Sequence, residues 1–227
     1  MDESVRQVVT RSPKRTVGLI NCSWFQQRPI EHESRLEKHF VHRALLYPAL
    51  TALQHQPFRL QLKDPRQSYT PDFLLTFQGA QFAVIEVKRS ERIKALKPRF
   101  DEIAAILGEQ GLLFYVVHQG QIEGEQRAQR ALLLRRYAML AMPADLIKSS
   151  IAFVDEKPGG VRIGTLLNKQ KLSLPQLYHL LARRYISASP RLLLSEDDKV
   201  YSANKEITNA ANQFGTWFGC APWRANT

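Results

Sequence analysis

The feature that most constrains this chain is a pair of adjacent stretches, residues 72–76 and 82–88, that meet at a turn around Gly79. Side chains along a strand point alternately to opposite faces, and the second stretch is otherwise apolar around Glu86. If the two strands pair symmetrically about the glycine, Asp72 lies directly opposite Glu86 on one face. Two carboxylates in that position repel each other. The sequence therefore predicts a β-hairpin whose opposed acidic side chains require a nearby cation.

A lysine and a divalent metal ion are the candidates for that charge compensation. Lys88 lies on the same predicted strand face as Glu86, and carboxylates are preferred ligands of Mg²⁺. A bound metal neutralises a phosphodiester and activates water for attack, while a neighbouring cation stabilises the developing charge. Asp72, Glu86 and Lys88 are therefore candidate catalytic residues. The alternatives are ordinary, since an aspartate after proline is often a turn residue and a Glu-x-Lys strand face is often a solvated ion pair.

A further carboxylate, Glu37, lies in the first turn of a predicted helix that begins at Ser34. It is a candidate third ligand, and Glu33 is the neighbouring alternative. Ser34 and Glu37 also fit a capping box, in which the glutamate side chain returns to the backbone of Ser34. Taken by itself, this local pattern favours the capping role over the ligand role.

The charge balance favours a polyanionic partner. The chain has 32 Lys and Arg against 21 Asp and Glu, a net charge of +11, and nucleic acid is the simplest partner for such an excess. The two cysteines, Cys22 and Cys220, cannot form a disulfide framework or a zinc site by themselves, which fits a reducing cytosol. No apolar stretch approaches ~18 residues, so no membrane span is expected. The N-terminus is polar and lacks the apolar segment of a secretory signal.

Periodicity predicts alternating helices and strands, which is typical of a mixed α/β sandwich. Before the hairpin we expect a helix from Ser34 that ends or kinks at Pro48, a strand that opens at Gln56 and continues through Leu62, and a turn at 64–68. After the hairpin we expect a helix from about Pro98 that ends at Gly108 or Gly111, a buried strand at 112–117, and a basic helix at about 124–140.

The pattern changes in the later part of the chain. Residues 163–167 and 173–185 are predicted to form a helix-turn-helix, with Ser173 as the N-cap of the second helix. Residues 191–194 and 199–201 are predicted to form a small β-wing. Together they indicate a winged-helix domain.

Four separate motifs lie along the first part of the chain: Ser-Arg-Leu-Glu at 34–37, Gln-Pro-Phe at 56–58, Tyr-Thr-Pro-Asp-Phe at 69–73 and Val-Ile-Glu-Val-Lys at 84–88. These motifs resemble the TnsA family, whose members are the restriction-endonuclease-like, PD-(D/E)xK endonuclease subunits of heteromeric transposases. Their order, character and approximate spacing agree over about residues 30–140, and residues 163–201 resemble the family's C-terminal winged helix more loosely.

The resemblance implies a bacterial, cytoplasmic enzyme of the α/β class, with a restriction-endonuclease-like mixed sheet flanked by helices and followed by a small winged helix. Such proteins cut the 5′ ends of a cut-and-paste transposon in double-stranded DNA. A TnsB-type transposase cuts and joins the 3′ ends, and a TnsC-type AAA+ ATPase connects both to target selection. Some of these transposons are guided by CRISPR complexes.

By position, the resemblance makes Glu37, Asp72 and Glu86 the Mg²⁺ ligands, with Mn²⁺ expected to substitute, and makes Lys88 the catalytic lysine. It outweighs the local preference for a capping role at Glu37. The position of Glu86 can be glutamine in this family, and glutamate is commoner in the wider nuclease superfamily. Four basic residues that follow the site could hold the DNA backbone, although each could equally belong to a solvated segment. They are Arg89, Arg92, Lys94 and Lys97.

Two other functions remain open: a junction resolvase or restriction-type nuclease on the same fold, and a non-catalytic DNA-binding or scaffolding subunit. The expected divisions are an N-terminal arm at 1–30, an endonuclease domain at 31–142, a winged helix at 143–202 and a C-terminal tail at 203–227. The arm contains a basic segment at 11–15 that is expected to be a solvated terminus. The aromatic tail is expected either to pack on the body or to bind a partner.

Overall fold

The computed structural model describes residues 16–203 and 207–225, so the basic segment at 11–15 lies outside the described residues. The chain divides into two compact units. The first comprises Met1–Phe40, Ala49–Ile122 and Ile207–Thr227, and the second comprises Val41–Pro48 and Glu123–Glu206. This division differs from the expected one, because the C-terminal residues belong to the first unit and the second unit includes residues before 142.

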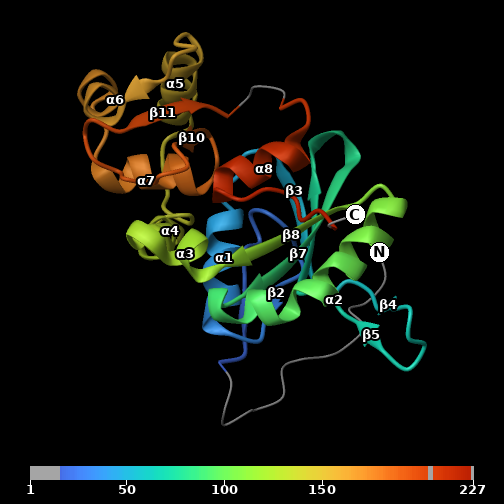
Figure 1. Cartoon of the computed structure of the whole chain (residues 1–227). Helices are drawn as coiled ribbons and strands as arrows, with labels where there is room; N and C mark the ends of the chain where they lie inside the picture. Colours follow the sequence, from blue (N-terminus) through green and yellow to red (C-terminus); the bar gives the residue numbers. More distant parts are fainter. Residues whose placement is uncertain (1–15, 204–206, 226–227) are drawn as a thin grey trace. The chain divides into compact units, whose positions relative to one another are not determined.

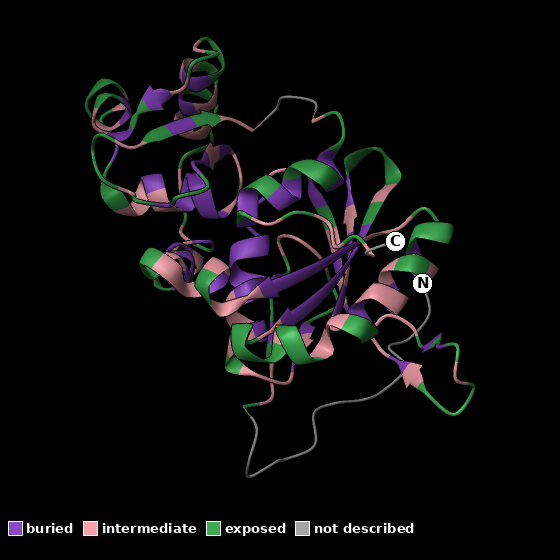
Figure 2. Ribbon diagram, in the orientation of Figure 1, coloured by how far each residue is buried: buried purple, intermediate pink, exposed green. Residues whose placement is uncertain are grey.

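A four-stranded mixed sheet forms the centre of the first unit (Figure 1). Three neighbouring strands are antiparallel, whereas the last pair, β7 and β8, is parallel. The parallel strands β7 and β8 are buried along most of their length (Figure 2). The predicted mixed α/β class is therefore confirmed. In spatial order the strands are β3 (Leu50–His55), β6 (Phe73–Phe77), β7 (Gln81–Lys88) and β8 (Leu113–His118).

The hairpin formed by β6 and β7 has the predicted register. Phe73 pairs with Ile85, so the two strands are symmetric about Gly79. This glycine has a φ of 73°, a conformation that glycine adopts without the steric cost of a side chain. One residue beyond the ladder, the register sets Asp72 opposite Glu86.

One face of the sheet is covered by α2 (Ser90–Glu109), which packs on Val84 and Phe114. The prediction that this helix begins near Pro98 is wrong, because Pro98 lies inside it. A contact distant in sequence holds the earlier start, since the Ser90 N–H donates to the Gln119 side chain over 2.7 Å. The buried residues of α2 are Phe100, Ile103 and Leu107.

The opposite face of the sheet is covered by α8 (Ala210–Phe218) and by the start of α1 (Arg35–Ala44). The backbone N–H of Trp223 donates to the Phe114 carbonyl over 2.7 Å, which attaches the segment after α8 to β8. Of the two roles considered for the tail, packing on the body is the one observed. The aromatic rings that meet around the fully buried Phe214 are Phe40, Phe77, Tyr115 and Phe218.

The predicted strand from Gln56 to Leu62 is wrong in its position. The sheet strand β3 ends at His55, before Pro57, and only a two-residue strand follows. Proline has no N–H for a sheet ladder.

The predicted turn at 64–68 is confirmed, and α1 ends at Ala44 rather than at Pro48. The short elements are β1 (Gly18–Ile20), β2 (Ile30–His32), β4 (Leu60–Gln61), β5 (Ser68–Tyr69), η1 (Gln78–Ala80) and α3 (Gln119–Glu123).

The second unit combines helices with a three-stranded antiparallel sheet of order β10-β11-β9. Ser173 forms the predicted cap, as a capping box with Gln176. The predicted wing strand at 191–194 is wrong, because Leu192 and Leu194 have positive φ, which a strand does not tolerate. The elements are η2 (Gly124–Gln126), α4 (Arg127–Arg136), α5 (Ala144–Asp155), β9 (Val161–Arg162), α6 (Ile163–Gln170), α7 (Leu174–Ala182), β10 (Ile186–Ala188) and β11 (Lys199–Ser202).

Among the helices that the structure describes, none is long and apolar enough to cross a membrane.

Candidate active site

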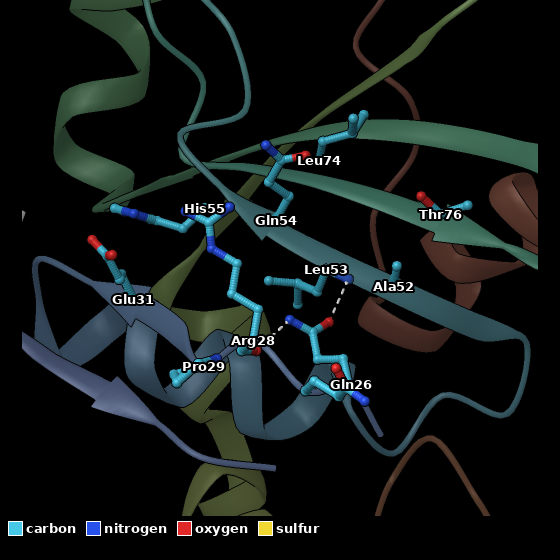
Figure 3. Close-up of a pocket in the computed structure, with 11 residues that line it drawn as sticks. Gln26, Arg28, Pro29, Glu31, Ala52, Leu53, Gln54, His55, Leu74 and Thr76 are labelled. Carbon is cyan, nitrogen blue, oxygen red and sulfur yellow. Dashed lines mark hydrogen bonds between the residues drawn. The ribbon is translucent and has the colours of Figure 1, made fainter. Parts of the chain in front are cut away.

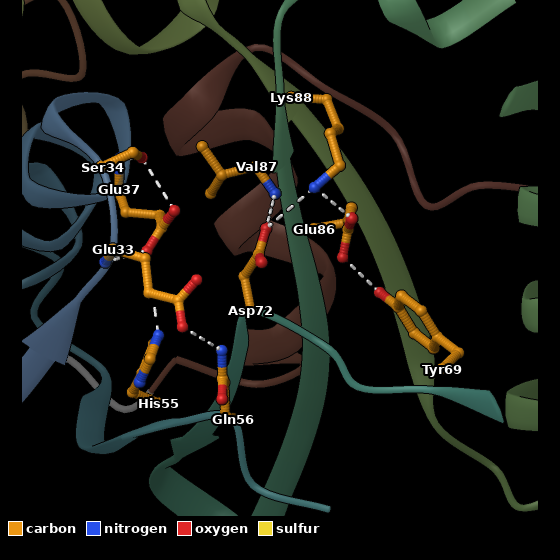
Figure 4. Close-up of polar contacts among 10 residues, drawn as sticks. All are labelled: Glu33, Ser34, Glu37, His55, Gln56, Tyr69, Asp72, Glu86, Val87 and Lys88. Atoms are coloured by element: carbon orange, nitrogen blue, oxygen red, sulfur yellow. Dashed lines mark hydrogen bonds and ion pairs between the residues drawn. The ribbon is translucent and has the colours of Figure 1, made fainter. Parts of the chain in front are cut away.

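A buried cluster of charges lies where β6 and β7 meet, in the first unit (Figure 4). The Lys88 Nζ lies 2.5 Å from the Glu86 Oε1 and 3.6 Å from the Asp72 Oδ2, so one ammonium contacts both carboxylates. The side chain of Glu86 is 5% exposed and that of Asp72 is 18% exposed. The Glu86–Lys88 contact is therefore not the solvated surface ion pair that the sequence left open as an alternative. The structure thus brings together three of the four predicted catalytic residues.

Asp72 is held at the end of its strand by the backbone of the neighbouring one. The Val87 N–H donates to the Asp72 Oδ2 over 2.7 Å. Burial and the charge of Glu86 raise the pKa of Asp72 well above its ordinary value, although Lys88 acts in the opposite direction. The ammonium therefore does not fully relieve the repulsion that the hairpin register imposes.

Glu86 is oriented by a residue to which the sequence assigned no role. The Tyr69 hydroxyl donates a short hydrogen bond to the Glu86 Oε2. Burial, together with the charges of Glu86 and Asp72, raises the pKa of Tyr69 well above its ordinary value, so the hydroxyl stays protonated and remains a donor. The two residues are 17 positions apart and on different strands, and no local periodicity indicates their contact.

Glu37 forms a helix cap. Its Oε1 accepts from the Ser34 hydroxyl over 2.7 Å, and its Oε2 accepts from the Glu33 N–H over 2.6 Å. The predicted capping role is therefore confirmed, with the N–H of Glu33 in place of that of Ser34. Burial raises the pKa of Glu37, and its charge raises the pKa of Asp72. Glu37 thus acts on the cluster through its charge, and both of its oxygens are engaged in the cap.

His55 lies beside Glu37 and was not predicted as a site residue. Its Nε2 is 3.8 Å from the Glu37 Oε2, and its ring packs on Phe73. Among the residues that the structure describes, none is a hydrogen-bond partner of either ring nitrogen. Burial, with a smaller contribution from His32, lowers the pKa of His55 to about 4, so the ring is neutral at physiological pH.

The donor chemistry fits a hard cation, although the ligands are not gathered in advance. Within residues 16–203 and 207–225, no three His, Cys, Asp or Glu side chains are already arranged to hold a metal ion. All three predicted ligands are carboxylates, the type that Mg²⁺ prefers. Asp72 makes both of its contacts through Oδ2, which leaves Oδ1 for a cation. Glu37 would have to release its contacts with Ser34 and Glu33 in order to join it.

The four basic residues expected to contact DNA follow the charge cluster, at the start of α2. They differ in whether a carboxylate already pairs with them. Lys97 pairs with Asp101 at 2.7 Å. Arg89 lies 3.8 Å from the Glu91 carboxylate, and both side chains are largely exposed. Arg92 and Lys94 are also exposed.

A cavity of about 390 Å³ lies next to His55, outside the charge cluster (Figure 3). One of its walls is held by Gln26, whose Oε1 accepts from the Leu53 N–H over 3.1 Å. Neither Asp72, Glu86 nor Lys88 lines it. The cavity is therefore a neighbour of the candidate site and not the site itself.

Asp72→Asn is expected to stabilise the metal-free first unit by about 0.2–1 kcal/mol at neutral pH, since it removes one of two opposed charges and keeps an acceptor for the Val87 N–H. Because the folded-state pKa of Asp72 is raised, the wild-type carboxyl becomes protonated as the pH falls through that value. The advantage of the variant should then disappear at acidic pH. Thermal unfolding in EDTA at a series of pH values measures this. A large loss of stability at neutral pH would make Asp72 a structural residue instead.

No protein-family model matches the chain, and no curated protein matches it significantly.

Proposed function

We propose that this chain is a metal-dependent DNA endonuclease of the PD-(D/E)xK type, and specifically the subunit of a TnsA-type heteromeric transposase that cuts the 5′ ends of the transposon. The observation that carries the proposal is the partly buried Lys88 ammonium in contact with both Asp72 and the buried Glu86 on adjoining strands. Glu37, from the preceding helix, adds a third carboxylate near enough to affect the pKa of Asp72.

The chain's own residues supply binding and charge in this proposal. A divalent cation held by Asp72 and Glu86, with Glu37 as the further ligand, would neutralise the phosphodiester and make water a stronger nucleophile. Burial lowers the pKa of Lys88, but the charges of Asp72 and Glu86 outweigh that effect and leave it raised. Lys88 therefore stays protonated and acts as a donor to the attacking water or to the negative charge on the phosphate. Tyr69 keeps Glu86 in place.

The reaction that fits these roles is in-line attack of water on the phosphodiester. The bond from phosphorus to the 3′ oxygen breaks, which leaves a 5′-phosphate and a 3′-hydroxyl. Arg89, Arg92, Lys94 and Lys97 would contact the backbone of the double-stranded DNA beside the cut. Exposed Arg92 and Lys94 are better placed for this than Lys97, which is paired with Asp101.

The order of elements in each unit supports the proposed fold. In the first unit a helix, an antiparallel hairpin, a second helix and a parallel strand follow one another, which is the order of a restriction-endonuclease-like core. In the second unit the order α5, β9, α6, α7, β10, β11 is that of a winged helix, with β10 and β11 as the wing. Its helix α7 would enter a DNA groove or serve as a docking surface for a protein.

The proposed partners are a TnsB-type transposase and a TnsC-type AAA+ ATPase, in the cytoplasm of a bacterium. The test is reconstitution of the full chain with such a transposase, transposon-end DNA and Mg²⁺. We expect cuts at the 5′ ends only when both proteins are present, loss of cutting in EDTA and recovery with Mn²⁺. Cleavage of branched DNA or of a fixed site without any partner would support a resolvase or a restriction-type nuclease. Excision that survives loss of Lys88 would support a non-catalytic subunit.

A further inference from the structure

The β4–β5 hairpin is a firmly held basic projection beside α2 (Figure 1). Its inward side chains Leu60, Leu62 and Tyr69 are buried in the core cluster that contains Phe100 and Ile103. Burying three large side chains from so short a hairpin fixes its backbone, and its outward side chains are mainly polar and basic. The exposed cations are Arg59, Lys63 and Arg66.

Two exposed guanidinium groups converge on one residue of this hairpin. The Arg59 Nε donates to the Ser68 Oγ over 2.7 Å, and the Arg99 Nη2, from α2, donates to the Ser68 carbonyl over 3.1 Å. Among the residues that the structure describes, no carboxylate forms an ion pair with either arginine. Each guanidinium has five N–H donors, and one contact leaves most of them available. Two cations that lie beside one residue and have no ion-paired carboxylate favour binding of an anion.

The converging arginines contact the residue before Tyr69, which links them to the charge cluster. Ser68 precedes Tyr69, whose hydroxyl reaches Glu86, and the Arg99 guanidinium lies 5.9 Å from the centroid of the Tyr69 ring. We propose that Arg59 and Arg99 form a binding site for one phosphate of the DNA backbone, next to the phosphodiester that is cut. This inference rests on the proposed endonuclease function. The planar guanidinium matches phosphate geometry, and such contacts fix the register of the DNA without reading its sequence.

The test measures how the full chain binds a short double-stranded DNA of arbitrary sequence. Fluorescence anisotropy reports the binding, in EDTA and at several salt concentrations. Arg59→Ala and Arg99→Ala should each raise Kd about tenfold, because each removes a charge-assisted hydrogen bond. The double variant should show a slope of log K against log salt that is shallower by about 0.9, the value for one lost phosphate contact. Arg66→Ala is the matched control: Arg66 lies in the same hairpin but already contacts Asp64 at 3.2 Å. It should change Kd much less.

Three results would overturn the inference: unchanged binding by the double variant, an equal effect of Arg66→Ala, or no measurable binding by the wild-type chain. Because both arginines are exposed, the thermal midpoints of the variants should match that of the wild type, which separates a lost contact from a lost fold. A cleavage assay on the Lys88→Ala variant separates failure of the phosphate site from failure of the endonuclease proposal. If that variant is inactive while the double arginine variant binds DNA normally, only the phosphate site fails. If Lys88→Ala cuts normally, the endonuclease assignment fails.

Discussion

Lys88→Ala is expected to lower the rate of 5′-strand cleavage by about 10²–10³-fold, the effect of removing one preorganised donor from a site of developing charge. The substitution also leaves Asp72 and Glu86 facing each other without the ammonium that contacts both of them. The rate is measured on transposon-end DNA with the partner transposase and saturating Mg²⁺. It should be recorded well below the melting temperature of the variant, because losing the ammonium that contacts both carboxylates leaves their repulsion uncompensated and destabilises the fold.

Two further variants make this result specific. Lys148→Ala removes an exposed lysine on α5 and should leave the rate close to that of the wild type. Lys88→Arg keeps the charge but replaces a compact ammonium with a larger planar fork between Asp72 and Glu86, so most of the loss should remain. Glu86→Gln keeps an acceptor for Tyr69 and should retain more activity than Glu86→Ala. Normal cleavage by Lys88→Ala would show that the cluster is structural.

Phe214→Ala is expected to destabilise the first unit by about 3–5 kcal/mol, the usual cost of truncating a fully buried phenylalanine. Phe214 is 0% exposed and lies at the centre of the aromatic cluster that attaches α8 to the sheet. Intrinsic tryptophan fluorescence during urea unfolding reports on this unit alone. All three tryptophans of the chain lie in it: Trp24, Trp217 and Trp223.

Phe82→Ala is the matched control for this prediction. Phe82 lies on β7 in the same unit, but its side chain is 40% exposed, so truncation should cost much less. Comparable losses in the two variants would mean that α8 contributes little to the unit. In that case the C-terminal residues would be free to serve a partner instead.

Local pattern was sufficient for features whose cause is local. Alternation along residues 82–88 and a glycine turn predicted the hairpin register, because a symmetric two-strand pairing has a single solution once the turn is known. The cap of α7 at Ser173 was likewise predictable, since its partner is three residues away. For Arg89, Arg92, Lys94 and Lys97 the contact with DNA stays a prediction, and the sequence pattern did not indicate the pairing of Lys97 with Asp101.

The errors arose where distant contacts override local preference. The preference of proline for a first turn predicts a start of α2 near Pro98, but the Ser90 N–H donates to the Gln119 side chain and the helix begins about two turns earlier. The wing strand was placed at 191–194, where Leu192 and Leu194 adopt positive φ. Neither the backbone conformation nor the distant partner can be inferred from side-chain periodicity.

The sequence by itself determined that Asp72 and Glu86 would oppose each other with Lys88 close by, because strand pairing is governed by short-range geometry. Only the tertiary structure decided the surroundings of that cluster. Folding brought the Tyr69 hydroxyl to Glu86, the capped Glu37 and neutral His55 to its other side, and two arginines to Ser68. These contacts join residues on separate elements, and they form because the apolar faces of those elements can be buried only against the same sheet.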